Sequence, residues 1–140
     1  PCNEPGKVVL TPRLGAARVR EVLPALIEGV QRAGRLVLWV CDPMHANALT
    51  TASGMKTRRF ADILDELEGA LEVHARAGVP LGGVHVELTG DDVTECLGGA
   101  GNLTEADLAT SYQSACDPRL NYSQAMELAL KLAKRLGDRA

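Results

Sequence analysis

The sequence predicts an α/β fold, a partial (β/α) barrel of the TIM type in which helices cover three parallel strands. Short, nearly continuous apolar strands alternate with amphipathic helices, which is the pattern of a parallel sheet buried by helices. Polar residues able to bind ligands follow the ends of the strands, where α/β proteins place their sites. The chain has 140 residues, whereas a complete barrel needs about 250.

Each element has its own justification along the chain. The first strand is short, apolar and β-branched, and the helix after it contains Pro24, which marks either its true start or a kink. The second strand is a continuous apolar run. A polar loop leads from it to a helix with a period near 3.6 residues. The third strand alternates apolar residues with His85, Glu87 and Thr89, and Thr104 can cap a short helix after it. Strands are expected at 7–11, 36–41 and 83–88, helices at 18–33, 59–77, 104–111 and 122–136, and the polar loop at 47–54.

Composition restricts the class of protein. Hydrophobic residues make up 46% of the chain, enough for the core of one domain spanning residues 1–140. A formal charge of −3 gives no electrostatic reason to expect a nucleic-acid partner. No apolar run approaches the 18 or so residues that span a bilayer.

The N-terminal residues and the cysteines bear on the cellular location of the protein. The N-terminus lacks the basic and apolar regions of a signal peptide, and the chain begins close to a strand, as a piece of something larger would. None of the four cysteines forms a CxxC pair. We therefore expect a reducing, cytoplasmic location. Cys96 and Cys116 are expected to be small buried side chains.

Three residues near strand ends are candidate ligands for a divalent metal. They are His45, Glu87 and Asp117, a mixed nitrogen and oxygen set that suits Mn, Fe, Co or Zn. Each also has a structural interpretation. The histidine can be an ordinary satisfied polar residue, the glutamate can be paired with a cation because it follows a buried strand, and the aspartate can cap a turn. His85 can either ligate or bond a neighbouring carboxylate. Cys2 precedes the first strand, at the wrong end of the sheet, and is rejected as a ligand.

Basic residues near the same strand ends are candidate anion contacts. Arg13 follows the first strand, where it can hold a phosphate or carboxylate or form a surface salt bridge. Lys56 and Arg58, the candidate catalytic residues, lie after the second strand and can supply further anion contacts or form a solvated charge cluster.

Five motifs carry a resemblance to the type II 3-deoxy-D-arabino-heptulosonate 7-phosphate (DAHP) synthases. The motifs cover nearly the whole chain in unbroken order and are highly specific to that family. They are residues 39–45 (WVCDPMH), 56–60 (KTRRF), 82–90 (GGVHVELTG), 94–99 (TECLGG) and 115–121 (ACDPRLN).

The resemblance implies a (β/α)₈ barrel that condenses phosphoenolpyruvate with erythrose 4-phosphate, the first step of the shikimate pathway. In that family a Cys, a His, a Glu and an Asp hold a divalent metal, commonly Mn or Co. The last three carry over to His45, Glu87 and Asp117, and Arg13 matches an Arg that holds the phosphoenolpyruvate phosphate. The metal acts as a Lewis acid on the aldehyde, the enol carbon attacks it, and water captures the resulting cationic centre before phosphate leaves.

The chain also departs from the family pattern. It matches only the last three strand–helix units, so the strands that carry the Cys ligand and most phosphate-binding residues are absent. Three strands cannot close a barrel. We therefore expect the chain to pair with copies of itself or with a complementing chain. A non-catalytic relict that acts as a binding or scaffold module is the alternative function.

Overall fold

The computed structural model describes residues 3–137, so Cys2 lies outside the described residues. The chain divides into two compact units. Unit 1 comprises the residues up to Asn47 together with Asp62–Val86, and unit 2 comprises Ala48–Ala61 and the residues from Glu87 onward.

Unit 1 contains a three-stranded parallel sheet, as the sequence predicts. Its strands are β1 (Val9–Leu10), β2 (Leu38–Cys41) and β5 (Gly83–Val84), in the order β1-β2-β5. The register places Val9 opposite Leu38 and Val40 opposite Gly83. The strands are shorter than expected, and the third ends at Val84 rather than at residue 88. One further bond from the His85 N–H to the Cys41 carbonyl, 2.8 Å long, extends the ladder beyond that point.

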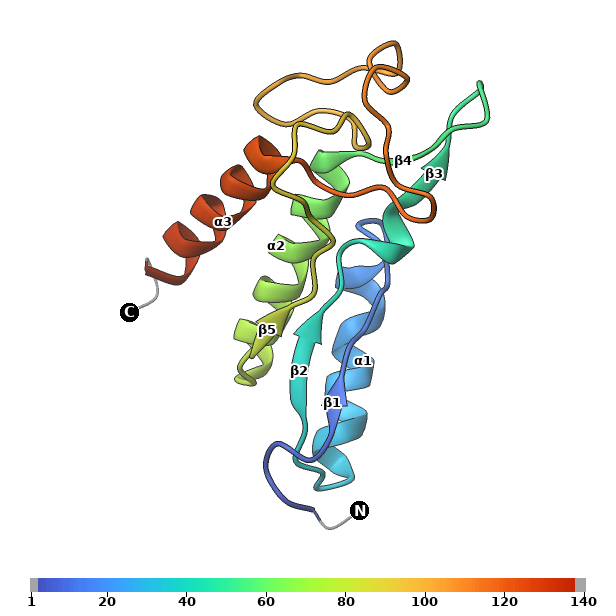
Figure 1. The fold of residues 1–140 in the computed structure, drawn as a ribbon. Coiled ribbons are helices and arrows are strands. Elements are labelled where there is room, and N and C mark those ends of the chain that lie inside the picture. The colour runs from blue at the N-terminus through green and yellow to red at the C-terminus, as the bar shows by residue number, and fades with distance from the viewer. Residues whose placement is uncertain (1–2, 138–140) are drawn as a thin grey trace. The chain divides into compact units, whose positions relative to one another are not determined.

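Two helices cover one face of this sheet (Figure 1). They are α1 (Val19–Arg32) and α2 (Phe60–Ala77), of which the residues from Asp62 belong to unit 1. Trp39 and Cys41 of β2 are buried, whereas Leu38 remains 42% exposed. The alternation shows that one sheet face packs on the helices while the other face is open.

Helix α1 corrects one expectation about Pro24. The helix begins at Val19, so Pro24 lies inside it and does not mark its start. The Gly15 carbonyl accepts from the N–H groups of Arg18 and Val19, which begins the first turn well before the proline. The fixed φ of proline suits a helix, but Pro24 cannot donate to the carbonyl four residues earlier, and its ring crowds that carbonyl.

Unit 2 contains a hairpin where the sequence predicts only a polar loop. Strands β3 (Ala48–Thr50) and β4 (Lys56–Arg58) pair in antiparallel fashion. The Thr51 N–H bonds the Met55 carbonyl at 2.9 Å, and Gly54 at φ +84° completes the turn. This hairpin could not be predicted from the sequence, because its short strands are not marked by a run or an alternation of apolar residues.

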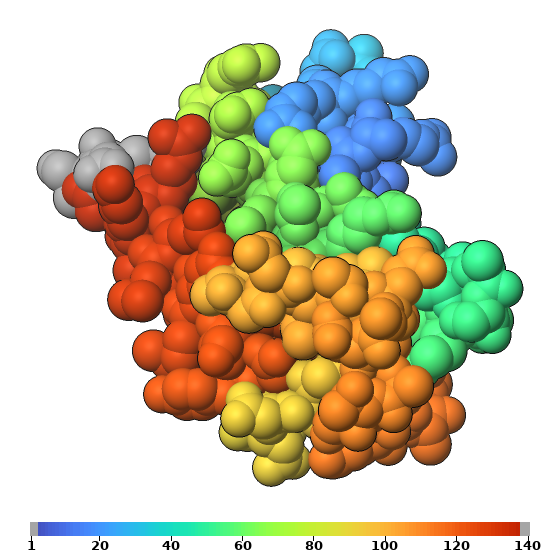
Figure 2. All heavy atoms as spheres, turned by 90° about the horizontal axis from the view of Figure 1, so that it is seen from above, coloured from blue at the N-terminus to red at the C-terminus, as the bar shows by residue number. Residues whose placement is uncertain are grey.

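Helix α3 (Tyr122–Gly137) packs on the long connection that precedes it. The Gln124 amide donates to the carbonyls of Cys96 and Gly98, each at 3.0 Å. Figure 2 shows this connection, in orange, against α3, in red, and against the β3–β4 hairpin. The second contact includes a 2.8 Å hydrogen bond from the Tyr112 hydroxyl to the Lys56 carbonyl.

The short helix expected at residues 104–111 is wrong. This segment forms consecutive turns, with the Asp107 N–H bonded to the Thr104 carbonyl and the Thr110 N–H bonded to the Asp107 carbonyl. The Thr104 N–H and hydroxyl both donate to the Asp107 carboxylate, at 2.8 and 2.6 Å. These side-chain bonds compete with the helical pattern, as is common for Thr and Asp.

No helix within residues 3–137 combines the length and the apolar character that crossing a bilayer requires.

Candidate functional site

Asp42 and His45 form a tightly bonded pair after β2 in unit 1. Asp42 is 1% exposed, and His45 begins the short 3₁₀ helix η1 (His45–Asn47). One carboxylate oxygen of Asp42 accepts from the N–H groups of Met44 and His45, at 3.0 and 3.2 Å. The other lies 2.7 Å from Nδ1 of His45. The predicted ligand His45 is thus oriented by a carboxylate that the sequence analysis did not single out.

Two further residues of unit 1 lie beside this pair. The rings of His85 and His45 have centroids 5.7 Å apart, and Asp42, His45 and His85 each offer a ligand atom within 4.8 Å of the others. Arg13 is 59% exposed, with its Nε 3.6 Å from Asp42. Its geometry in this structure is that of a partly exposed ion pair, which leaves the guanidinium accessible to an anion.

Glu66 is a buried carboxylate of unit 1 that sequence reasoning missed. It is 1% exposed, and its Oε1 accepts from the N–H groups of Leu14 and Gly15 at 2.8 and 2.9 Å. Its Oε2 accepts from the Asn47 amide at 2.8 Å. Burial raises its pKa, and these hydrogen bonds oppose the shift. Glu66 therefore ties the segment after β1, which carries Arg13, to the end of η1.

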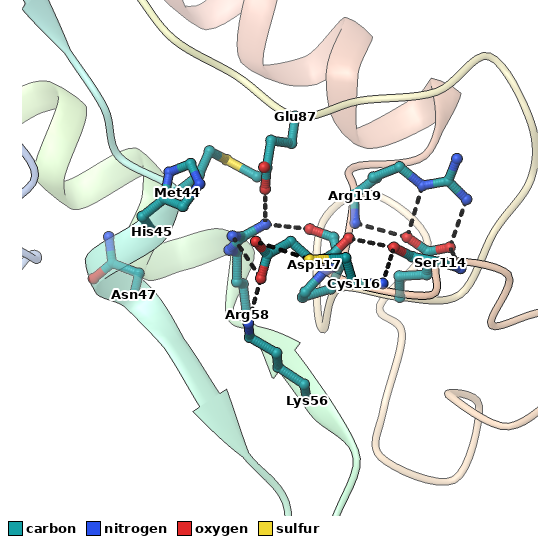
Figure 3. Close-up of polar contacts among 12 residues, drawn as sticks. Met44, His45, Asn47, Lys56, Arg58, Glu87, Ser114, Cys116, Asp117 and Arg119 are labelled. Carbon is teal, nitrogen blue, oxygen red and sulfur yellow. Dashed lines mark hydrogen bonds and ion pairs between the residues drawn. The ribbon is translucent and has the colours of Figure 1, made fainter. Parts of the chain in front are cut away.

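In unit 2, Arg58 joins the two predicted carboxylate ligands (Figure 3). Its Nη1 donates to Glu87 at 2.6 Å and to the Pro118 carbonyl, and its Nη2 lies 3.9 Å from Asp117. Arg58 is wholly buried, so it is not part of a solvated charge cluster. Its Nε and Nη2 are buried without a hydrogen-bond partner among the described residues. A buried cation with spare donors marks a site built for negative groups.

Lys56 contacts one of these carboxylates, that of Asp117, from the solvent side. Its side chain is 47% exposed, and its ammonium bonds the Asp117 carboxylate. This hydrogen bond raises the pKa of Lys56. Lys56 and Arg58 are two residues apart on β4 and so share one face of the strand. Lys56 is exposed at the end of the strand, whereas Arg58 is enclosed by the segment around Pro118.

Cys116 departs from its expected burial. It is an exposed free thiol, whereas Cys96 is buried as predicted. Cys116 lies in the loop that carries Asp117, with its sulfur 3.8 Å from that carboxylate. The Cys116 N–H donates to the Ser114 hydroxyl at 3.3 Å, so a local polar bond rather than apolar packing holds this residue.

Glu95 holds the Asp117 loop in place, and sequence reasoning did not identify that role. It is fully buried and accepts from the N–H groups of Gln113 and Ser114 at 3.1 and 2.8 Å. It also accepts from the backbone, Nε and Nη2 of Arg119, at 2.7, 3.1 and 2.7 Å. Burial raises the pKa of Glu95, but the hydrogen bonds from Arg119 and the backbone outweigh it and leave the pKa lowered.

Each unit carries some of the predicted ligands. Unit 1 offers the imidazole of His45, held by Asp42, and unit 2 offers Glu87 and Asp117, held by Arg58 and by the loop that Glu95 anchors. Imidazole and carboxylate donors suit a divalent transition metal. Arg13 and Lys56 are exposed cations able to bind phosphate or carboxylate groups.

The sequence of the chain is similar to a known protein family and to several of its members. A family model described as the class-II DAHP synthetase family matches residues 1–133. The chain is 51% identical over 138 residues to the phospho-2-dehydro-3-deoxyheptonate aldolase AroG of Mycolicibacterium smegmatis, which covers 99% of this chain and 30% of that protein. The aldolase of the same name in Streptomyces coelicolor is also 51% identical over 138 residues, 99% of this chain and 31% of that protein. Its counterpart in Streptomyces lividans is 48% identical over 138 residues, 99% of this chain and 94% of that protein. The chain thus spans about 30% of the length of the first two relatives.

Proposed function

Because the chain belongs to the class-II DAHP synthetase family, we propose that it is the carboxyl-terminal part of a DAHP synthase barrel. The reaction is the condensation of phosphoenolpyruvate with erythrose 4-phosphate. The observation that carries the proposal is the convergence of Glu87 and Asp117 on the buried Arg58, since these carboxylates stand in the motifs that resemble the family.

We propose that His45, Glu87 and Asp117 bind one divalent metal, Mn or Co. The donor types fit such an ion, and each donor is oriented by a neighbouring group. Burial raises the pKa of Cys41 and Cys96 to about 12, so neither is a ready thiolate, and the Cys ligand of the family is expected from strands outside this chain. When bound, the metal supplies Lewis acidity for the aldehyde of erythrose 4-phosphate.

The basic residues have separate proposed roles in substrate binding and positioning. Arg13 is proposed to hold the phosphoenolpyruvate phosphate, and its exposed guanidinium is suited to bidentate binding. Lys56 is proposed to contact a second anionic group of the substrates from the solvent side. Arg58 is enclosed, so its catalytic contribution comes through the position of Glu87. Together these contacts orient the two substrates for carbon–carbon bond formation.

The open face of the unit 1 sheet supports a partner that completes the barrel. Val9 and Leu38 are 50% and 42% exposed, and within residues 3–137 the strands β1 and β5 each pair on one side only. We propose that another copy or a complementing chain supplies strands to these edges. A dilute, stable monomer in light scattering would contradict this. The free thiols of Cys41, Cys96 and Cys116 support a cytoplasmic location.

Release of inorganic phosphate with both substrates tests the function. The assay is run on the chain alone and on the chain mixed with the amino-terminal remainder of a relative. Turnover that appears on mixing and is lost in His45→Ala is the expected result. Metal binding without turnover in the mixed sample would instead favour the non-catalytic module.

A further inference from the structure

We propose that Asp42 is a positioning residue of the metal site, whose carboxylate keeps the His45 proton on Nδ1 and so makes Nε2 the ligand atom. The inference rests on the proposed function, because it takes His45 as a metal ligand. It adds a residue that the family comparison and the sequence motifs leave without a role.

The geometry of Asp42 leaves it little freedom. The carboxylate is 1% exposed, and its Oδ1 accepts from the N–H groups of Met44 and His45 at 3.0 and 3.2 Å. These two bonds fix the carboxylate plane at the start of η1. The second oxygen is then aimed at the imidazole, 2.7 Å from Nδ1 of His45. That distance is typical of a charge-assisted hydrogen bond.

This contact determines where the imidazole proton lies. An ionised carboxylate can only accept hydrogen bonds, so Nδ1 of His45 must be the donor. A neutral imidazole has one donor and one acceptor nitrogen, and the acceptor is therefore Nε2. Histidine ligands commonly donate their second N–H to a carboxylate, which fixes the tautomer and the orientation of the ring. Asp42 is placed to do both for His45.

A direct ligand role for Asp42 is the competing interpretation. Asp42, His45 and His85 offer ligand atoms within 4.8 Å of one another. Direct binding would require Asp42 to exchange its 2.7 Å bond to His45 for a metal bond and would leave Nδ1 of that ring without its acceptor. His85 is exposed, and its ring lies beside His45 rather than bonded to Asp42. The existing bonds of Asp42 favour the positioning role.

Asp42→Asn separates the tautomer effect from the turn. The amide oxygen can still accept from the Met44 and His45 N–H groups, but the amide nitrogen donates to Nδ1 and drives the imidazole proton to Nε2. We expect Mn²⁺ affinity in calorimetry to fall about 10- to 100-fold. Asp92→Asn, which removes the same charge from an exposed position, and His85→Gln are expected to change affinity less than about twofold. Asp42→Asn with unchanged affinity, or His85→Gln weakened as strongly, overturns the proposal.

The tautomer itself is read by nitrogen-15 NMR of the histidine side chains in the metal-free protein. We expect protonated Nδ1 and unprotonated Nε2 in His45, with the two reversed in Asp42→Asn. A proton on Nε2 in the unmodified chain would overturn the proposal even if the variant does not fold. His45→Ala distinguishes a failure of the proposed metal site from a failure of the positioning role. If it keeps full Mn²⁺ affinity, the proposed metal set fails, whereas loss of affinity in His45→Ala but not in Asp42→Asn refutes only the positioning role.

Discussion

Replacing Glu95 with Gln is expected to loosen the loop that carries Asp117. The amide oxygen can keep the bonds from the Gln113 and Ser114 N–H groups, now 3.1 and 2.8 Å long. The amide nitrogen takes the place of Oε2, which now accepts from the Arg119 backbone N–H at 2.7 Å. In the variant two donors therefore face each other, and the Arg119 N–H loses its acceptor. One buried N–H without an acceptor costs about 1–3 kcal/mol. The Arg119 guanidinium is 30% exposed and can turn to solvent, so we assign it no further cost.

The same substitution changes the response to acid. The pKa of Glu95 is lowered in the folded chain, because its hydrogen bonds outweigh the effect of burial. Its stabilising contribution is therefore present above its unfolded pKa, ordinarily 4.5, and is lost as pH falls through the lower folded value. Glu95→Gln removes this titration, so the variant loses less stability on acidification than the unmodified chain.

Amide hydrogen exchange measures the loosening of the loop, and urea unfolding at neutral and at acidic pH measures the response to acid. Trp39 is the single tryptophan and lies in unit 1, so its fluorescence does not report on unit 2, and the exchange of the Ser114 and Arg119 amides is followed instead. Faster exchange at these amides and a lower unfolding midpoint are expected. Glu105→Gln, at an exposed position of the same unit, serves as the control. Glu95→Gln with unchanged exchange and midpoint would show that the network does not hold the loop.

Three further predictions concern other parts of the chain. Lys56→Gln should raise Mn²⁺ affinity in calorimetry by up to about fivefold, because it removes the ammonium that competes for Asp117; unchanged or weaker binding would count against competition. Gly99→Ala should lower the free energy of unfolding by about 1–2 kcal/mol, since φ is +78° and the new Cβ would lie 2.8 Å from a buried α3 side chain, whereas Gly101→Ala, in open space, should change it little. Burial lowers the pKa of His74 from its ordinary 6.5, so its contribution to stability is present above 6.5 and is lost as pH falls through the folded value; in pH-dependent urea unfolding His74→Gln should show a smaller acid loss, and an identical pH profile would refute this.

The parallel sheet was predictable because its strands carry their own signal. Trp39 and Cys41 are buried in an apolar run, and the polar residues that follow mark the strand end. The ends of the strands were not predictable to the residue. Strand β1 pairs only with β2 and is two residues long. Its length therefore depends on the pairing with β2 rather than on the apolar run of β1 itself.

The polar networks of the site could not be predicted from local pattern. Glu66 and Glu95 look like ordinary helix and loop acids in the sequence, and only tertiary contacts with distant N–H groups reveal that they are buried. Arg58 likewise reads as one of a basic run, yet Glu87 and Pro118 enclose it from 29 and 60 residues away. Thr104 was misread because its bonds to Asp107 favour turns over a helix.

Calorimetric titration of the chain with Mn²⁺ tests the central claim most directly, namely that His45, Glu87 and Asp117 bind the same ion. We expect one ion per chain, with affinity reduced at least about tenfold in each of His45→Ala, Glu87→Gln and Asp117→Asn. Binding of more than one ion, or full affinity in any one of the three variants, would contradict it.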